Sequence, residues 1–370
     1  MSRSHLQSGD VLLSIIGTIG EASLVSSDRD ATCSCKLAIL RPHNIRSEYL
    51  AVYLRTRHGR SQIMRNTRGA VQMGFLLEDM DQIRIPRFSD DFEAAISESV
   101  DRSKRSRLES SVETEKSAQL LLVGLGVESW RAPEPLSYTQ SSRDAFAAGR
   151  FDAEYFYPAK VVAQMLLATA SDITVGDQFE SVRKLWQPDG GESDVEVRNY
   201  DLNDALVPFL DGAKPPTSNE FIASAKKRVQ EGDLVVSRLR SYLKEIAIVE
   251  SGGDVPMVAS TEFIVLRPKS HASLPVEALM IYLRSALPQL VFKWSQDGSN
   301  HPRFDEGELL RLPIPRAIIA EARQYVQSVQ LIKSSRKRST QLLEAAKRAV
   351  EIAIEDSEAA ALKFLKSVAK

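Results

Sequence analysis

Short runs of apolar, often β-branched residues occur in two parts of the chain, and in both parts the first run follows a Gly-Asp pair. Gly-Asp fits a turn, and two such runs separated by a short connection are typical of paired β-strands. A third, alternating run is followed by Arg and Pro, and proline ends a strand because it has no N–H to donate. The pattern predicts strands at residues 11–16, 22–25 and 36–40 and at residues 234–237, 246–249 and 262–266.

A longer amphipathic stretch follows each set of predicted strands. Its apolar positions predict one helix over residues 47–65 and another over residues 275–294. An Ile-Pro-Arg tripeptide then ends the globular part, because proline restricts the residue before it to extended conformations. Each half is therefore expected to be an α+β unit.

The same short motifs recur in the same order in both halves, which indicates an internal duplication. Gly-Asp-hydrophobic-Ser and Leu-Arg-Pro repeat with similar spacing, and three further matches share one offset of 229 residues. The matched segments are 9–14 with 232–237, 40–42 with 266–268, 53–55 with 282–284, Phe75 with Phe304, and 85–87 with 314–316.

Each half continues into a proline-free stretch rich in Glu, Lys, Arg, Ser and Ala. From Ile318 to Ala353 apolar or small residues recur in steps of three and four, apart from Arg336, and this predicts a coiled-coil seam. The first stretch, residues 89–123, is a weaker seam because residues 103–111 are polar. Two helices of about 35 residues, each about 50 Å long at 1.5 Å per residue, are expected to pack against each other.

The pattern divides the chain into five parts. These are a first α+β domain at 1–87, a first long helix at 88–123, a linker at 124–171, a second α+β domain at 172–316 and a second long helix at 317–370. The two domains are unequal, because about 60 residues precede Gly232-Asp233 in the second and eight precede Gly9-Asp10 in the first. We expect the first domain to be shortened at its N-terminus or completed from elsewhere.

Composition is that of an ordinary soluble globular protein, with 43% hydrophobic and 26% charged residues. The formal net charge of −1 means that a polyanionic partner must meet a local basic patch. No apolar run reaches the roughly 18 residues of a membrane span and no signal peptide is evident, so a cytoplasmic location without membrane contact is expected. Cys33 and Cys35 are too close for an ordinary disulfide and are expected to be small, partly buried thiols.

Enzyme signatures are missing from the sequence. There is no phosphate-binding Gly-rich loop, no nucleophile elbow and no pair of histidines at metal-ligand spacing. The one Pro-Pro pair, Pro215-Pro216, lacks the neighbours of an amino-methyltransferase motif. A weak alternative is a metal-dependent nuclease using Asp189 and Glu196, but Arg198 stands where such sites carry lysine.

The double array of motifs, each followed by a long helix, resembles the specificity subunit of type I restriction-modification systems over nearly the whole chain. Residues 150–155, Arg-Phe-Asp-Ala-Glu-Tyr, also resemble the segment that leads into the second half of such subunits. The resemblance implies two target-recognition domains, each reading half of a split double-stranded DNA site, separated by two long antiparallel coiled-coil helices that dock partner subunits. It implies no catalysis and no cofactor in this chain. S-adenosylmethionine, ATP and Mg would act in partner subunits, the DNA adenine methyltransferase and the restriction helicase-nuclease.

Side chains with paired donors would carry base reading, since one bidentate contact contributes about 1–3 kcal/mol of discrimination. For the basic run the alternative is a charged edge strand, for the Gly-containing loop a turn that satisfies its own side chains, and for the tryptophan the core. The candidates are Arg238, Arg240, Tyr242 and Lys244 after the Gly-Asp strand, Lys293, Asn300, His301 and Arg303 in the loop, and Lys184 with Trp186.

The charge distribution weakens the DNA prediction for the isolated chain. Residues 172–223 hold 4 basic and 11 acidic side chains, whereas residues 224–303 hold 11 basic and 8 acidic ones. Little counterion release is expected from so small a positive excess, so we expect sequence-specific binding only in complex with partners. The main alternative is a degenerate interaction scaffold in a phage-defence complex that reads no DNA itself.

Overall fold

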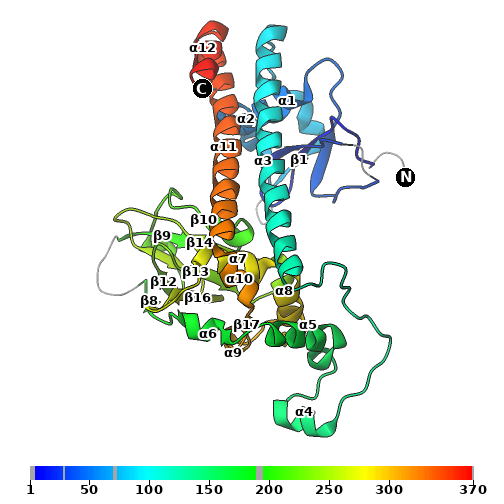
Figure 1. Ribbon diagram of the computed structural model, residues 1–370. Helices are drawn as coiled ribbons and strands as arrows, with labels where there is room; N and C mark the ends of the chain where they lie inside the picture. Colours follow the sequence, from blue (N-terminus) through cyan, green and yellow to red (C-terminus); the bar gives the residue numbers. More distant parts are fainter. Residues whose placement is uncertain (1–4, 28–29, 70–72, 189–194, 369–370) are drawn as a thin grey trace. The chain divides into compact units, whose positions relative to one another are not determined.

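The structure is a computed structural model that describes residues 5–27, 30–69, 73–188 and 195–368 (Figure 1). The chain forms two compact units. Unit 1 comprises residues 1–110 and 334–370, and unit 2 comprises residues 111–333. Within the described ranges, no helix has both the length and the apolarity of a membrane span.

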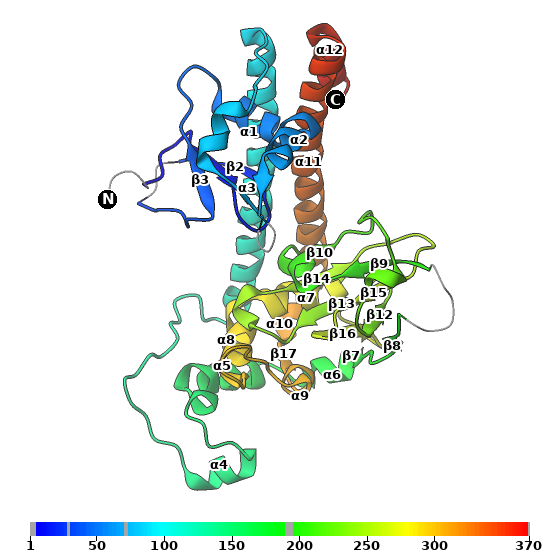
Figure 2. The same cartoon turned by 180° about the vertical axis from the view of Figure 1, so that it is seen from behind.

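Unit 1 is built on a three-stranded antiparallel sheet with the order β2-β1-β3 (Figure 2). Val11 and Leu13 point into its core, where they join Tyr49 and Tyr53 of the first helix. The elements are β1 (Val11–Ser14), β2 (Ala22–Leu24), β3 (Leu37–Leu40), α1 (Ser47–Arg55), α2 (Arg57–Arg65), β4 (Thr67–Arg68), β5 (Gly74–Phe75) and the 3-10 helix η2 (Leu77–Gln82).

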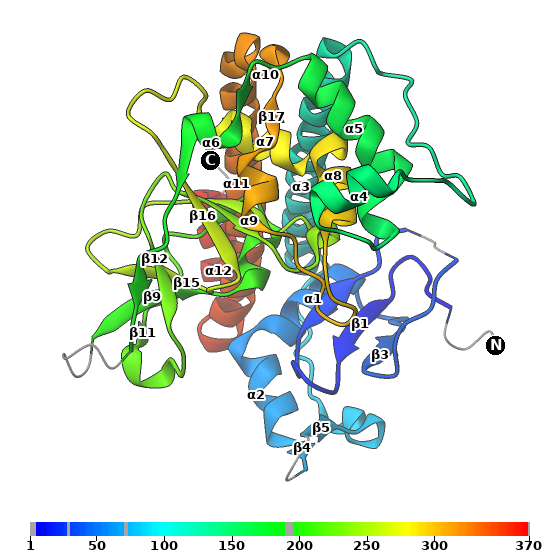
Figure 3. The same cartoon turned by 90° about the horizontal axis from the view of Figure 1, so that it is seen from below.

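Unit 2 contains two five-stranded sheets. The first has the order β10-β14-β13-β16-β7 and consists of β7 (Phe179–Ser181), β10 (Phe209–Leu210), β13 (Leu234–Ser237), β14 (Ile246–Val249) and β16 (Phe263–Pro268). The second, seen in Figure 3, has the order β11-β9-β15-β12-β8 and consists of β8 (Leu185–Trp186), β9 (Glu196–Tyr200), β11 (Thr217–Ser218), β12 (Lys226–Val229) and β15 (Met257–Ala259).

The central strands of unit 2 are buried on both faces. Val235 and Val265 pack with Tyr200 and Ala259 of the second sheet. The side chains that alternate with these along the strands, such as Leu234, point to the opposite face of the sheet and pack on helices. The remaining elements are α4 (Ser142–Ala148), η3 (Glu154–Phe156), α5 (Pro158–Thr169), β6 (Ile173–Thr174), α6 (Val175–Gln178), η4 (Leu202–Leu206), η5 (Asn219–Phe221), η6 (Ser241–Leu243), α7 (Val276–Arg284), α8 (Ala286–Ser295), α9 (Glu306–Leu310) and β17 (Pro313–Ile314).

The duplication expected from sequence is confirmed by equivalent strands in both units. The order β2-β1-β3 of unit 1 matches β14-β13-β16 of unit 2. In each unit the aspartate of the Gly-Asp pair is buried and binds, through both carboxylate oxygens, the arginine of Leu-Arg-Pro: Asp10 with Arg41 and Asp233 with Arg267. The motifs are therefore kept together by an ion pair whose carboxylate is buried. The α+β class is confirmed.

Gly9 and Gly232, which precede these aspartates, have φ of +87° and +82°. Residues with a Cβ rarely adopt this left-handed conformation, so the turn before the strand favours glycine. The tyrosine hydroxyls of the repeated Tyr-Leu-Arg are also equivalent, since Tyr53 donates to the carbonyl of Arg84 and Tyr282 to that of Pro313.

The single helices predicted over residues 47–65 and 275–294 are wrong, because each is interrupted at an equivalent hydroxyl residue. Thr56 and Ser285 have extended backbones, with ψ of 161° and 168°. Each hydroxyl donates to a tyrosine carbonyl 2.6 Å away, and Thr56 also accepts from the N–H of Gly59. Each polar side chain thus binds the end of the preceding helix, and the Thr56 side chain also caps the next one.

The two long helices have the expected lengths, 35 residues in α3 (Asp90–Gly124) and 34 in α11 (Ala322–Glu355). In unit 1 the Ser103 hydroxyl lies 2.8 Å from that of Ser339. In unit 2 Ser328 donates to Glu113, and a Cβ on Gly124 would lie 2.8 Å from that of Ala317. Numbers rise on one helix as they fall on the other, so the pairing is antiparallel as predicted.

The polar stretch at residues 103–111 lies in this helix contact and is not a gap in it. Ser103, Ser106 and Ser110 are buried, and small side chains allow a close approach of two helices. Arg336, the exception in the predicted seam, is half-buried, and its pKa is lowered by burial and by nearby Arg107.

The structure divides the expected second long helix at residues 321 and 356–357, which gives α10 (Arg316–Ala320), α11 and α12 (Glu358–Val368). Part of the expected linker is also folded, because Ala163 and Leu167 of α5 are fully buried in unit 2. The division of the chain into five domains stays a prediction.

Candidate nucleic-acid interface

Three segments of unit 2 that are distant in sequence meet beyond the end of β13. They are the loop 238–245 between β13 and β14, Glu262 just before β16, and the segment 296–304 after α8. Backbone bonds join them, since Arg238 donates to the carbonyl of Glu262 and Arg240 to that of Pro302. Two of the three predicted candidate sets are therefore brought together.

Glu262 lies between two of the candidate arginines. Its carboxylate accepts from Arg303 at 2.7 Å and from Arg238 at 3.2 Å, and these bonds, Arg303 first, lower its pKa below the ordinary value. The Arg303 guanidinium also donates to the carbonyl of His301, so its donors are largely engaged. Arg238 uses Nε for Glu262 and is 43% exposed, which leaves a guanidinium edge that faces solvent.

Of the remaining members of the cluster, Arg240 is half-buried, and Tyr242, Asn300 and His301 are exposed. Arg240 lies 3.4 Å from the Nδ1 atom of His301, a long contact, and Asn300 is exposed beside it in sequence. Tyr242, at the tip of loop 238–245, is 60% exposed, and Leu243 is 39% exposed. Donors and an apolar tip thus share one loop.

Lys244 lies at the end of this loop, and its surroundings disfavour its charge. Burial, together with the positive charge of Arg284, lowers the pKa of Lys244. Arg284 also donates to the backbone carbonyls of Lys244 and Ile246 at 2.7 and 2.8 Å. A cavity of about 320 Å³ beside Lys244 and Arg284 is lined as well by Glu115 of α3, so it is mixed in charge.

Lys293 and Trp294 form a second group of contacts, distinct from the cluster of loop 238–245 and segment 296–304. The Lys293 ammonium lies 4.6 Å from the centre of the Trp294 ring. Tyr157 stacks on the same indole, with ring centres 4.0 Å apart and planes 22° from parallel. Trp294 is therefore occupied by the protein itself, while Lys293 is exposed.

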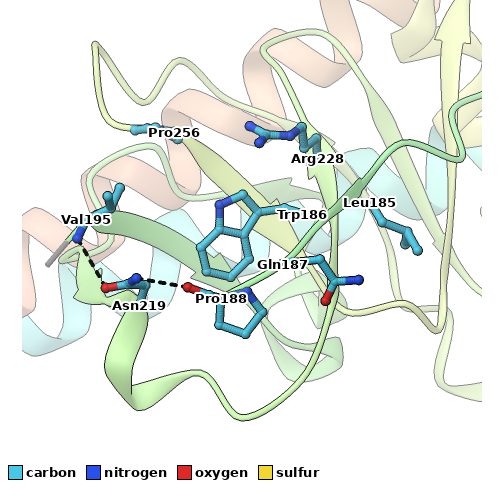
Figure 4. Close-up of a pocket in the computed structure, with 8 residues that line it drawn as sticks. All are labelled: Leu185, Trp186, Gln187, Pro188, Val195, Asn219, Arg228 and Pro256. Atoms are coloured by element: carbon cyan, nitrogen blue, oxygen red, sulfur yellow. Dashed lines mark hydrogen bonds between the residues drawn. The ribbon is translucent and has the colours of Figure 1, made fainter. Parts of the chain in front are cut away.

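Trp186 lines a cavity of about 510 Å³ in the second sheet (Figure 4). The indole is 7% exposed and belongs to a small core with Val197 and Val258. Asn219 on the same wall bonds to the backbone of Val195 and Pro188, so its amide is engaged. Lys184, two residues from Trp186, is exposed.

Sequence reasoning missed two members of these sites. Arg228 is exposed at the cavity of Trp186, within the basic run Lys226-Lys227-Arg228, and this run was a usable signal. Glu262 joins Arg238 and Arg303 across 24 and 41 residues of sequence, and nothing local indicates such a link.

The described residues add no support to the alternative of a metal-dependent nuclease. Asp189 lies outside the described residues. Arg198 donates to the backbone carbonyls of Lys214 and Gly252, as a structural arginine does. In the part of the chain that the structure describes, no group of three or more His, Cys, Asp or Glu residues could hold a metal ion. Cys33 is half-buried and Cys35 is exposed.

Solved structures of type I systems are similar to this chain. The HsdS subunit from Thermoanaerobacter tengcongensis is 15% identical, with 96% of this chain and 84% of that chain covered and a TM-score of 0.30. The type I restriction-modification system S subunit from M. genitalium is 13% identical, with 100% and 84% covered and a TM-score of 0.35. The chain is similar to type I specificity subunits.

A third solved structure, described as the structural basis of complex assembly and conformational transition of the type I R-M system, is 15% identical. The match covers 95% of this chain and 84% of that chain, with a TM-score of 0.30. No protein-family model matches the chain, and no curated protein does. The three structures belong to the same class of system as the resemblance found in the sequence.

Proposed function

We propose that this chain is the DNA-specificity subunit of a type I restriction-modification system, which directs adenine methyltransferase and restriction subunits to a bipartite site. The observation that carries the proposal is the cluster of loop 238–245 and segment 296–304, placed on a duplicated α+β frame that continues into two paired helices.

The cluster has the chemistry that major-groove reading requires. A guanidinium offers two parallel donors to the O6 and N7 atoms of guanine, and Asn offers a donor and an acceptor to adenine. Arg238 is fixed at Nε by Glu262 and keeps a free edge, so its donors are oriented before DNA arrives. Tyr242 adds an aromatic surface at the tip.

Affinity of the isolated chain is expected to be low. The cluster holds few cations, and the acidic residues 172–223 lie in the same unit. Since phosphate contacts supply most of the salt-dependent affinity, tight binding needs partner subunits that close around the duplex. We propose, as the resemblance implies, that this chain is not catalytic, binds no cofactor and is cytoplasmic. S-adenosylmethionine, ATP and Mg would be used by those partners.

Methylome sequencing of a host with and without the gene, both carrying the partner subunits, tests the proposal. We expect a defined bipartite motif with methylated adenines only when the gene is present, and loss of one half of that motif with Arg238→Ala. Arg323→Ala removes an exposed charge on α11 and is the matched control, which should leave the motif unchanged. Identical methylomes with and without the gene would refute the proposal.

A non-reading scaffold is the second candidate, favoured by Gly17 and Gly20 in the loop between β1 and β2 of unit 1, where unit 2 carries the basic loop between β13 and β14. It predicts co-purification with methyltransferase subunits and no motif in the methylome. Co-purification together with a motif that depends on Arg238 excludes it.

A further inference from the structure

The hairpin loops of the two units can be aligned residue by residue from the strand register. Leu13 lies opposite Ala22 in unit 1, and Val236 lies opposite Ile246 in unit 2. The serine after each first-strand residue donates its N–H to the residue before the second strand, Ser14 to Glu21 and Ser237 to Glu245. Loop 15–21 of unit 1 is therefore the equivalent of loop 238–245, which is one residue longer.

The same two loop positions are left-handed in both units. Gly17 and Gly20 have φ of +83° and +88° in unit 1. Arg240 and Lys244, at the matching distances from the strands, have φ of +49° and +52°, and they are the non-glycine residues with positive φ in the part of the chain that the structure describes. A side chain makes this conformation unfavourable, whereas glycine adopts it freely.

Folding alone does not explain the two side chains. The Arg240 guanidinium makes the long contact with His301, at 3.4 Å, and its charge partly offsets the rise that burial causes in the pKa of Glu245. The Lys244 ammonium has no hydrogen bond to any residue within the described ranges, and it faces the charge of Arg284. Glycine at either position would relieve backbone strain and remove few contacts.

Contacts with the surrounding structure fix the backbone of the loop at both left-handed positions. Arg284 fixes the carbonyl of Lys244, the carbonyl of Pro302 fixes the N–H of Arg240, and Ser241 between them is buried. Tyr242 and Leu243 then project at the tip. Backbone strain that neighbouring contacts enforce is typical of functional sites.

We infer that Arg240 and Lys244 are specificity-determining residues, kept in a strained backbone because their side chains contact one DNA half-site on either side of Tyr242. This inference rests on the proposed function. The two cations flank the tip, so they would meet the phosphates or base edges beside the step that the tyrosine contacts.

The test is the double variant Arg240→Gly/Lys244→Gly of the full chain, examined by thermal unfolding and, with the partner subunits, by methylome sequencing. We expect the unfolding midpoint to rise by about 2–4 °C, because strain is relieved. Base preference in one half of the methylated motif should fall at least tenfold, while the other half stays defined. Tyr242→Ala should change the same half and leave the midpoint within about 1 °C.

Arg143→Ala/Arg323→Ala removes the same charge from exposed positions of unit 2 and is the matched control, with midpoint and motif expected to be unchanged. A lower midpoint in the glycine variant would overturn the inference, because the side chains would then support the fold. An intact motif in that variant would overturn it while the proposed function stands. A wild-type chain that yields no motif would overturn both.

Discussion

Units 1 and 2 share a backbone frame but carry different side chains at the end of the sheet where loops 15–21 and 238–245 lie. Arg238 and Ile15 occupy equivalent positions, since each donates its N–H to the residue before the third strand, Glu262 and Lys36 respectively. Arg303 is the equivalent of Gly74, because these residues bridge to Leu239 and Ile16. The arginine-glutamate-arginine cluster is therefore a property of unit 2, and the fold does not require it.

The units also differ in what covers the sheet. In unit 2 Val235 and Val265 are fully buried beneath the second sheet. The equivalent residues of unit 1, Leu12 and Ile39, are half-buried. The shared frame needs the Asp–Arg pair and one apolar face, while the second layer and the loop chemistry are additions seen in unit 2.

The largest expected effect comes from breaking the ion pair that both units share. Asp233→Ala removes the carboxylate that binds the partly buried Arg267 and should lower the free energy of unfolding by about 3 kcal/mol. Asp10→Ala should cost unit 1 less, about 2 kcal/mol, since Arg41 is 40% exposed and Arg267 is 29% exposed. Denaturant unfolding followed by hydrogen exchange in each unit measures both; a larger loss for Asp10→Ala would contradict the ranking.

Placing a side chain at the equivalent left-handed position of unit 1 should have the next largest effect on stability. Gly17→Arg places a side chain at φ +83°, where a Cβ meets no atom within 4 Å, so backbone strain is the main penalty. We expect a loss of about 1–2 kcal/mol in unit 1. Gly17→Asn is the control because asparagine tolerates this conformation better, and equal losses for the two variants would show that strain is not the cause.

Glu262→Gln should separate charge from shape in the cluster. The variant keeps the size of the side chain but weakens its bonds to Arg238 and Arg303, so we expect a loss of about 1 kcal/mol. The pKa of Glu262 is lowered in the fold from its ordinary value of 4.5, so its contribution is present at neutral pH and is lost as the pH falls below that ordinary value and through the lowered one. The stabilities of wild type and variant should therefore converge in an acid titration, and curves that stay parallel throughout it would contradict this account.

Lys160 gives unit 2 a sensitivity to alkaline pH. The side chain is 1% exposed, lies 3.2 Å from the centre of the Tyr155 ring and 3.8 Å from Glu308, and burial lowers its pKa from 10.5 to about 8. The folded chain thus binds fewer protons than the unfolded chain between these values, and stability should rise by about 2 kcal/mol from pH 8 to 10. Lys160→Met should abolish the rise, which denaturant midpoints at the two pH values detect.

Repetition made much of the fold predictable from sequence. The repeated strands and the long helices follow from motif spacing and from the three-four steps of apolar residues, since these patterns reflect local geometry. The interruptions at Thr56 and Ser285 were missed because a single hydroxyl residue between apolar helical positions resembles a tolerated polar site. Its extended backbone is stabilised by the tyrosine carbonyl, which the sequence pattern does not reveal.

The sequence predicted which basic residues belong to the candidate site, but it did not predict how they are arranged. Basic residues near 240 and 300 were visible as runs, but Glu262 links them through long-range strand pairing. Trp186 was a candidate stacking surface with the core as its alternative. The structure leaves it 7% exposed, because its strand pairs with β12 and its indole packs with Val197 and Val258 in a second sheet that sequence periodicity did not resolve.

Hydrogen exchange of the chain in its methyltransferase complex, with and without a duplex bearing the motif found in the methylome, tests the difference between the units most directly. The account predicts slower exchange of the amides in loop 238–245 on DNA binding and a smaller change in loop 15–21. Equal slowing in both loops, or slowing in loop 15–21 alone, would contradict it.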